Sequence, residues 1–286
     1  MLEGMVVWKN GRLVRAEEAV VPVLDHGLLY GDGVFEGVRF YNRRPFRLER
    51  HLARLSRSAA GIDLSLPFDA GELAAGVRNT IEAASAADGY LRILATRGEG
   101  ALGVNPEGCG RSAVFIIGSQ LSVVPAERRE RGLTAVIAST RRSAPDSLDP
   151  RIKSLNYLTS VLARAEANRA GVDEAIMLNR HGCVVEASVE NIFVVLDGVL
   201  RTPPVTDGAL DGITRGAVLE LAAARGLPAE ERSLTPVDLY AADEAFLTGT
   251  GAGLLPLSQV DGRRIRQCPG PVFESLDAAY QALVRR

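Results

Sequence analysis

Short apolar runs separated by turn residues divide the first third of the chain into strands. Two pairs of runs are each separated by only two or three turn-forming residues, and each pair predicts a β-hairpin. A different spacing follows at residues 49–60, where Leu52, Leu55 and Ala59 recur at the intervals of a helix. The pattern predicts strands at 5–8, 12–15, 34–41, 44–48, 90–96 and 113–118, and helices at 49–60 and 68–86.

Beyond residue 126 the apolar runs are shorter and alternate with segments of helical spacing. A loop rich in Ser, Pro and Asp at 141–150 lies between the first strand and the first helix, and that helix stops at Gly171. The pattern predicts strands at 134–140, 174–178, 183–187, 191–196, 199–201 and 245–248, and helices at 156–169, 214–225 and 272–284. Residues 119–126 contain polar residues and a proline, as a linker does. The length of 286 residues also fits two domains.

The composition narrows the possible functions without choosing one. Apolar residues make up 47% of the chain and charged residues 24%, as in an ordinary soluble globular protein. The net charge of −2 gives no support to binding of nucleic acid or another polyanion. The three cysteines, Cys109, Cys183 and Cys268, are widely spaced and indicate a reducing compartment without disulfides. The sequence contains no CxxC or HExxH motif, so we expect no metal site. We also expect neither a signal peptide nor a membrane span.

The scarcity of lysine makes Lys153 the first candidate for chemistry. Of the 33 basic residues, only Lys9 and Lys153 are lysines. Lys9 belongs to a turn signal, whereas Lys153 lies between the 141–150 loop and a predicted helix. Arginine cannot replace lysine where an amine must lose its proton and act as a nucleophile. Composition alone leaves two alternatives, a lysine that arose by chance and a Schiff-base lysine.

Two glycine-containing segments are candidates for binding a phosphate group. The segment 212–215 (GITR) opens a predicted helix, whose first backbone N–H groups and Thr214 hydroxyl attract anions. The segment 249–251 (GTG) can bring further N–H groups close to a phosphate, and Arg54 can add charge. Each segment taken alone is more often a plain helix cap or a plain turn. Together with a rare lysine, they suggest a phosphorylated cofactor that carries an aldehyde, and pyridoxal 5'-phosphate fits that description.

Such a cofactor needs an acidic partner for its pyridine nitrogen, because a protonated ring withdraws electrons better. Glu186 ends the predicted apolar strand at 183–187. A carboxylate there is costly unless it has a cationic partner. The alternative is a glutamate at the end of a strand that faces solvent.

Six separated motifs resemble those of the fold-type IV pyridoxal-phosphate enzymes, in the same order and over essentially the whole chain. That family includes branched-chain aminotransferases, D-amino-acid aminotransferases and aminodeoxychorismate lyases. The matching segments are 25–37 (DHGLLYGDGVFEG), 51–55 (HLARL), 152–157 (IKSLNY), 186–193 (EASVENIF), 212–215 (GITR) and 248–250 (TGT).

The resemblance implies a role for each matching cofactor residue. Lys153 matches the Schiff-base lysine, and Glu186 matches the acid that faces the pyridine nitrogen. The positions that match the phosphate-binding residues are Arg54, Ile213, Thr214 and Thr250, with Ile213 acting through its backbone N–H. Tyr157 resembles the tyrosine near the phenolic oxygen of the cofactor, although it follows the lysine one residue sooner than in some relatives.

The resemblance also implies an architecture. The expected fold is α/β (α+β), with a small N-terminal α/β domain at 1–118, a linker at 119–127 and a larger cofactor-binding pseudo-barrel domain at 128–286. Active sites in the family lie between the domains and receive a loop from the neighbouring subunit, so a homodimer is implied. We expect a cytoplasmic enzyme that binds amino acids and 2-keto acids, and neither nucleic acid nor a membrane.

At the substrate positions the chain is most similar to the branched-chain enzymes. The segments 35–39 (FEGVR) and 90–92 (YLR) resemble their motifs, and 102–104 (LGV) resembles the apolar loop that enters the neighbouring pocket. The resemblance implies substrate contacts from Tyr30, Phe35, Gly37, Arg92, Arg97, Leu102, Val104, Gly251 and Ala252. We therefore expect transamination between a branched-chain L-amino acid and 2-oxoglutarate through a Schiff base on Lys153.

Three departures from the branched-chain pattern keep two other activities open. The segment 187–189 (ASV) replaces a stretch that usually contains glycine, and 251–253 (GAG) replaces a turn that commonly runs Ala-Ala-Glu. Arg97 is reminiscent of an arginine that D-amino-acid enzymes use. A D-amino-acid aminotransferase is therefore one alternative, and an aminodeoxychorismate lyase, which would use the same cofactor residues, is the other.

Overall fold

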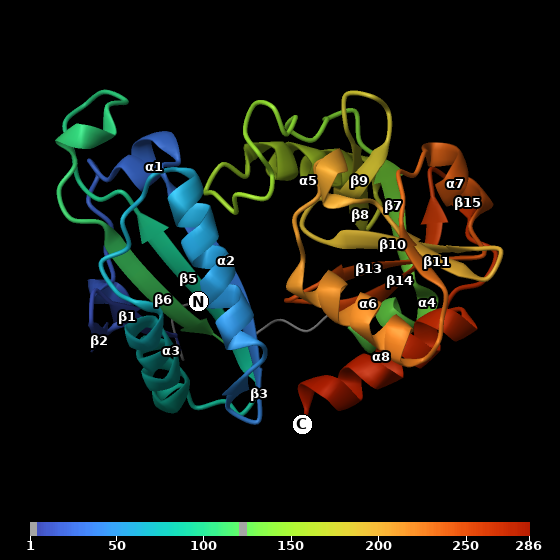
Figure 1. The fold of residues 1–286 in the computed structure, drawn as a ribbon, viewed down its shortest axis with the longest axis horizontal. Helices are drawn as coiled ribbons and strands as arrows, with labels where there is room; N and C mark the ends of the chain where they lie inside the picture. Colours follow the sequence, from blue (N-terminus) through green and yellow to red (C-terminus); the bar gives the residue numbers. More distant parts are fainter. Residues whose placement is uncertain (1–4, 120–124) are drawn as a thin grey trace. The chain divides into compact units, whose positions relative to one another are not determined.

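A computed structural model describes residues 5–119 and 125–286, which group into two compact units (Figure 1). Unit 1 holds the described residues up to 119 together with Ile152–Asn156, and unit 2 holds the described residues of 125–151 and 157–286. Both units combine helices with a sheet, which confirms the predicted mixed α/β class. No helix among the described residues has the length and apolar character needed to cross a membrane.

Unit 1 is built on an antiparallel sheet in the order β2-β1-β6-β5-β3-β4. Its strands are β1 Val6–Lys9, β2 Arg12–Val14, β3 Gly33–Tyr41, β4 Arg44–Pro45, β5 Gly89–Thr96 and β6 Ala113–Ser119. Its helices are α1 His26–Tyr30, α2 Leu48–Gly61 and α3 Ala70–Ala83, with short 3-10 turns η1 Ala16–Glu18 and η2 Pro106–Gly108. The long central strands β3 and β5 carry the predicted substrate positions Phe35, Gly37 and Arg92.

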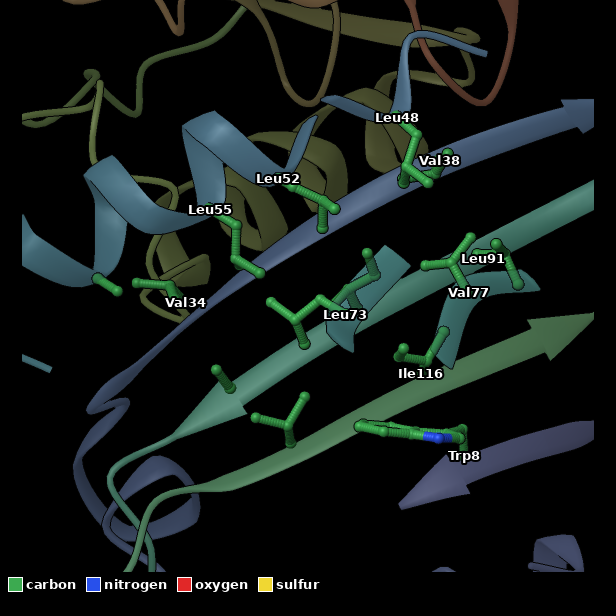
Figure 2. Close-up of a cluster of buried hydrophobic side chains, with 14 of the residues drawn as sticks. Trp8, Val34, Val38, Leu48, Leu52, Leu55, Leu73, Val77, Leu91 and Ile116 are labelled. Atoms are coloured by element: carbon green, nitrogen blue, oxygen red, sulfur yellow. The ribbon is translucent and has the colours of Figure 1, made fainter. Parts of the chain in front are cut away.

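The two longer helices of unit 1 cover one face of its sheet. Alternate residues of β3 and β5, such as Val34, Val38 and Leu91, point toward α2 and α3 (Figure 2). The helices contribute residues at helical spacing, including Leu55 on α2 and Leu73 on α3. Because side chains alternate along a strand, Phe35 and Gly37 face the opposite side of the sheet from this core.

Unit 2 is built on a larger mixed sheet in the order β12-β11-β10-β13-β14-β7-β8-β9, with β15 paired to β14. Its strands are β7 Leu133–Ile137, β8 Glu174–Leu178, β9 Val184–Ala187, β10 Asn191–Leu196, β11 Val199–Thr202, β12 Ala229–Glu231, β13 Glu244–Gly249, β14 Gly253–Val260 and β15 Arg263–Arg264. Its helices are α4 Ala126–Arg131, α5 Leu158–Ala170, α6 Ile213–Ala224, α7 Pro236–Ala241 and α8 Pro271–Val284, with the 3-10 turn η3 Val205–Asp207. The pairs β7–β8, β7–β14 and β11–β12 are parallel, and the others are antiparallel.

Two apolar clusters hold unit 2 together. The larger one combines the inner faces of β7–β10, β13 and β14 with α7, and includes Ile192, Leu247 and Leu257. The smaller one lies under α5, where Ala163 and Ala167 pack against Met177 of β8. Small alanine side chains on this face let α5 approach the sheet closely.

Several predicted elements differ from the observed ones for local reasons. The strand predicted at 44–48 is only Arg44–Pro45, because the proline lacks a backbone N–H and α2 already begins at Leu48. Strand β14 was not predicted, since Pro256 and the glycines before it weaken the strand pattern. The short helices α1, α4 and α7 and the strands β12 and β15 were also missed. Short elements bury few residues, so their pattern is weak.

The segment Ile152–Asn156 groups with unit 1, although the predicted domain at 128–286 contains it. Its backbone runs along β3: the N–H of Phe35 donates to the carbonyl of Lys153 at 2.9 Å, and the N–H of Leu155 donates to that of Gly33 at 2.9 Å. The predicted linker at 119–127 lies partly outside the described residues. The predicted domain boundaries therefore stay a prediction.

Candidate active site

Lys153 is anchored by its backbone and half-buried by its surroundings. Its N–H donates to the Ser58 hydroxyl on α2 at 3.0 Å, and its carbonyl accepts from Phe35 on β3 at 2.9 Å. Its Nζ atom lies 4.4 Å from the centroid of the Phe35 ring. A cation over an aromatic ring is stabilised there, and the ring also shields the amine from water on one side. The lysine is therefore held in one place within unit 1.

Phe35 gathers further predicted substrate residues on the sheet face that the helices leave uncovered. The Arg92 guanidinium lies 4.5 Å from the Phe35 ring centroid and 5.7 Å from that of Tyr90. A side chain at Gly37 would overlap the Tyr90 hydroxyl, so the Tyr90 ring would have to shift to accommodate one. Lys153, Phe35, Gly37 and Arg92 thus share one small region of unit 1, with two cations around an aromatic ring.

On the helix side of the same sheet, Arg54 is fixed by a buried cluster. Its Nε and Nη2 donate to the two oxygens of Glu36 at 2.6 and 2.9 Å. The Nδ1 of His51 lies 2.8 Å from the same carboxylate and donates its proton to it, since an ionised carboxylate only accepts. Burial raises the pKa of Glu36, but the hydrogen bonds from Arg54 and His51 outweigh it and lower that pKa from 4.5 to about 2. Glu36 thereby orients the guanidinium.

His51 completes this cluster as a neutral ring. Burial lowers the pKa of His51 below its ordinary value of 6.5, against the opposing effect of Glu36. Its Nε2 is buried and has no hydrogen-bond partner among the described residues. A neutral histidine beside Arg54 and Lys153 avoids adding a third positive charge to this part of unit 1.

In unit 2, Glu186 is a buried carboxylate with three donors. Its Oε2 accepts from the backbone N–H of Leu210 at 3.0 Å and from the Asn191 amide at 3.1 Å. Its Oε1 pairs with Nη2 of Arg142 at 2.9 Å. The cationic partner that a buried glutamate requires is therefore Arg142. Sequence reasoning identified neither this arginine nor the role of Asn191, because the 141–150 loop has no periodicity that would single out one arginine.

The N-terminus of α6 lies beside Glu186. The helix begins at Ile213 after Gly212, and no side chain of the described residues caps it. A side chain at Gly212 would overlap the Asn191 amide oxygen, so the helix start packs directly against the residue that holds Glu186. Ile213 and Thr214 are buried. Uncapped N–H groups at the start of a twelve-residue helix suit an anion such as a phosphate.

Arg215 is the fourth residue of the 212–215 segment. Its side chain makes internal contacts and does not serve the proposed phosphate site. Its Nη2 donates to the carbonyl of Pro203 at 3.0 Å and to Glu231 at 2.7 Å. The buried guanidinium thus ties α6 to the preceding loop and to β12. This supports a site at the helix start made of backbone N–H groups and the Thr214 hydroxyl.

Thr250 lies at the tip of the hairpin between β13 and β14, where Gly249 pairs with Gly253. The same strand places Thr248 opposite Asn191, at the start of β10. The Thr248 hydroxyl is buried and has no hydrogen-bond partner within the described part of the chain. The ends of β9 and β13 and the starts of β10 and α6 therefore meet at one edge of unit 2. That edge carries Glu186, Ile213, Thr214 and the 248–251 turn.

The remaining predicted residues are more scattered. Tyr157 is half-buried at the N-cap of α5, and Ala252 packs against the larger core of unit 2. A side chain at Gly251 would meet nothing, so space does not require glycine there. In unit 1, the Tyr30 hydroxyl accepts from the N–H of Gly103 at 2.8 Å, while Leu102 and Val104 are 78% and 82% exposed. Tyr30 therefore holds the 102–104 loop in place, while the apolar side chains of the loop do not pack against the rest of unit 1.

Arg97 makes an extensive set of internal contacts. Its Nε and Nη2 donate to both oxygens of Asp32 at 2.9 and 3.0 Å. Its Nη1 and Nη2 also donate to the carbonyls of Asp63 and Ile62 at 2.6 and 2.7 Å. These bonds give Arg97 a role in joining α1 and α2 to the end of β5. Its predicted role in substrate binding stays a prediction.

The family model described as class IV amino-transferase matches residues 33–260. A putative branched-chain-amino-acid aminotransferase of Methanocaldococcus jannaschii is 46% identical over 91% of this chain and 90% of its own length. The branched-chain-amino-acid aminotransferase of Escherichia coli K12 is 38% identical over 97% of this chain and 92% of its own length. A D-alanine aminotransferase of Bacillus licheniformis is 36% identical over 97% of this chain and 96% of its own length.

Solved structures agree with these relatives. The branched-chain aminotransferase of Thermoproteus uzoniensis with norvaline has a TM-score of 0.93 and 41% identity, over 98% of this chain and 95% of that one. The branched-chain amino acid aminotransferase of Thermobaculum terrenum in its PLP-bound holo form has a TM-score of 0.89 and 34% identity. The match covers 98% of this chain and 94% of that one.

Proposed function

Because this chain belongs to the class IV aminotransferases, which use pyridoxal 5'-phosphate, we propose that it exchanges an amino group between a branched-chain L-amino acid and 2-oxoglutarate. The observation that carries the cofactor assignment is the buried Glu186 carboxylate beside the uncapped start of α6. These two features match the charges at opposite ends of the cofactor. The names of the most similar relatives support the branched-chain substrate.

The residues of unit 2 fit this cofactor chemically. The start of α6 has no side-chain cap and offers backbone N–H groups and the Thr214 hydroxyl, and Thr250 adds a hydroxyl in the turn between β13 and β14. The buried hydroxyl of Thr248 lies at the same edge. These residues would hold the phosphate with Arg54. Glu186 would accept a hydrogen bond from the pyridine nitrogen, and Tyr157 would donate one near the phenolic oxygen.

Bound pyridoxal phosphate supplies an aldehyde that takes up amines and a ring that withdraws electrons from the carbon next to them. Lys153 would hold the cofactor covalently through its Nζ. The amine of Lys153 would also act as the acceptor and then the donor of the proton that leaves the substrate α-carbon. The backbone bonds to Ser58 and Phe35 fix the position of the Lys153 backbone within unit 1.

Substrate choice rests on the region around Phe35. Its ring supplies apolar surface for a branched side chain, and Arg92 supplies a cation for a carboxylate, so both an aliphatic amino acid and 2-oxoglutarate can be accepted. The exposed Leu102 and Val104 are suited to line the pocket of a second copy of the chain. A homodimer and a cytoplasmic location are part of this proposal.

The absorption spectrum of the purified holoenzyme tests the function. We expect a visible cofactor band that L-leucine removes and 2-oxoglutarate restores. In Lys153→Ala we expect this cycle of loss and return to stop. Bleaching by D-alanine alone would move the activity to D-amino acids, the alternative favoured by the Bacillus licheniformis relative. A band that neither amino acid changes would favour a lyase such as aminodeoxychorismate lyase.

A further inference from the structure

We propose that Arg142 is a positioning residue that keeps Glu186 ionised, and that Oε1, the oxygen that Arg142 contacts, is the one that meets the pyridine nitrogen. This inference rests on the proposed function, because it assumes that the ring nitrogen of pyridoxal phosphate meets Glu186. It adds which oxygen makes the contact and which side chain controls the proton between them. The residues that carry it all belong to unit 2.

The hydrogen bonds of Glu186 are divided unequally between its two oxygens. Oε2 already accepts from two donors, the Leu210 N–H and the Asn191 amide. Oε1 pairs with Arg142 at 2.9 Å. An ionised carboxylate offers about two acceptor positions on each oxygen. Oε2 is therefore filled, while Oε1 keeps a position for the N–H of a pyridinium ring.

Arg142 is held in place for this contact. Its backbone N–H donates to the carbonyl of Leu178 at the end of β8 at 2.9 Å, and its Nη1 reaches the Ser160 hydroxyl on α5 at 3.4 Å. The side chain is 10% exposed, and its Nε is buried without a hydrogen-bond partner among the described residues. An arginine with an unmade buried hydrogen bond costs stability. Its contact with Glu186 gives a functional reason to keep it.

The charge of Arg142 decides where the shared proton resides. A buried carboxylate next to a pyridine can exist as an ion pair, or as a neutral acid beside a neutral ring, and burial favours the neutral pair. Arg142 contacts Oε1 directly at 2.9 Å, so a ring whose nitrogen met the same oxygen would lie farther from the guanidinium than the carboxylate does. It therefore disfavours protonation of Glu186 more than protonation of the ring. The ring keeps the proton, which is the form that withdraws electrons.

The test compares two cofactors that differ only at one ring atom. The affinities of the apo protein for pyridoxal phosphate and for its analogue with CH in place of the ring nitrogen are measured by titration. We expect the wild-type protein to prefer the nitrogen-containing cofactor. Arg142→Gln and Arg142→Met should reduce that preference by at least about tenfold, equal to about 1.4 kcal/mol, while affinity for the analogue changes little. Arg142→Lys, which keeps the charge, should retain most of the preference.

A matched control is the adjacent Arg141→Gln. Arg141 is exposed and its guanidinium donates to the carbonyl of Ala138 at 2.9 Å, so the preference should be unchanged. Two charge-removing variants are used so that the test survives if one does not fold. A second readout is the ¹⁵N chemical shift of ring-labelled cofactor, which should move toward that of the neutral ring in either variant.

The outcomes separate this inference from the proposed function. If Arg142→Gln or Arg142→Met keeps the full preference while Glu186→Gln loses it, Glu186 meets the ring nitrogen and Arg142 does not control it. If the wild-type protein lacks any preference, Glu186 does not meet the ring nitrogen, and both the inference and that part of the proposed function fail. Loss of affinity for both cofactors alike would mean that Arg142 supports only the fold, and would also overturn the inference.

Discussion

Three carboxylates with little exposure in the described part of the chain, Glu36, Glu186 and Glu190, belong to small clusters that balance their charge in two opposite ways. Glu36 is ionised between Arg54 and His51, and Glu186 is matched by Arg142. Glu190 behaves in the opposite way: burial raises its pKa well above 4.5, and the neighbouring Glu174 raises it further. Single substitutions at these positions therefore have opposite expected effects.

Glu36→Gln should destabilise the protein at neutral pH by about 3 kcal/mol, because it leaves the Arg54 guanidinium buried without its carboxylate. The pKa of Glu36 is depressed from 4.5 to about 2, so its contribution to stability is present above pH 4.5 and is lost as the pH falls toward 2. The variant should therefore lose less stability than the wild type over that range. Urea unfolding at about pH 7 and about pH 3, on either side of the ordinary carboxyl pKa, measures both effects.

The control for this prediction is Glu49→Gln, an exposed position on α2, the helix that carries Arg54 and His51. It should change the unfolding free energy by less than about 0.5 kcal/mol. Equal unfolding curves for Glu36→Gln and Glu49→Gln at neutral pH would show that the buried cluster contributes nothing.

Glu190→Gln should stabilise the protein in mildly alkaline solution. Because the folded pKa of Glu190 is raised, its favourable contribution exists below pH 4.5 and is lost as the pH rises through the folded value. An amide cannot ionise, and it can donate to Glu174 as the protonated acid does. We expect a gain of about 1 kcal/mol or more at about pH 8 that disappears at about pH 4, measured by thermal unfolding at both pH values. Destabilisation at the higher pH would contradict the assignment, and exposed Glu82→Gln serves as the control.

At the scale of elements, α6 contains one glycine and follows another, and their environments contrast. Gly212 precedes the helix where Asn191 leaves no room for a side chain, whereas a side chain at Gly216 would meet nothing. The first glycine serves the close approach of a helix N-terminus to the residues that hold Glu186. The second lies within the helix and costs conformational entropy without any packing reason.

Gly212→Ala should destabilise the protein by about 1–3 kcal/mol through this overlap and weaken binding of pyridoxal phosphate. Gly216→Ala on the same helix should stabilise it by about 0.5–1 kcal/mol. Thermal unfolding of the apo proteins and cofactor titration measure the two effects. The prediction fails if Gly212→Ala binds cofactor as tightly as Gly216→Ala does.

Elements with a long, regular pattern could be predicted from the sequence, and those defined by distant contacts could not. Helix α2 follows from Leu52, Leu55 and Ala59, and its observed range is Leu48–Gly61. Lys153 and Glu186 were identified by residue type and by resemblance. The roles of three other residues arise only when the chain brings them to a carboxylate: Arg142, His51 and Asn191. Such pairings leave no periodic signal in the sequence.

At the scale of the whole molecule, the exposed 102–104 loop links substrate choice to assembly. Replacing both Leu102 and Val104 with serine should lower kcat/KM for L-leucine by about tenfold or more if the loop lines the pocket of a second copy. The unfolding free energy should change by less than about 0.5 kcal/mol, because both side chains are exposed within their own chain. Steady-state kinetics and urea unfolding test this, and unchanged kinetics would refute it.

The matched control is Leu13→Ser on β2, another exposed leucine of unit 1. It should alter neither kinetics nor stability. Sedimentation of the double variant shows whether the loop also contributes to association of the copies.

The return of residues 152–156 to β3 means that this chain cannot be divided into two independent halves. A fragment that ends at residue 119 lacks the segment that satisfies the Phe35 N–H and the Gly33 carbonyl, and it lacks Lys153 itself. Its exposed strand edge would be open to any extended peptide, including a synthetic one with the sequence of 152–156. A gene split for complementation, or a fusion that inserts another protein, should therefore lie outside residues 120–156, so that residues 152–156 stay on the same piece as the rest of unit 1.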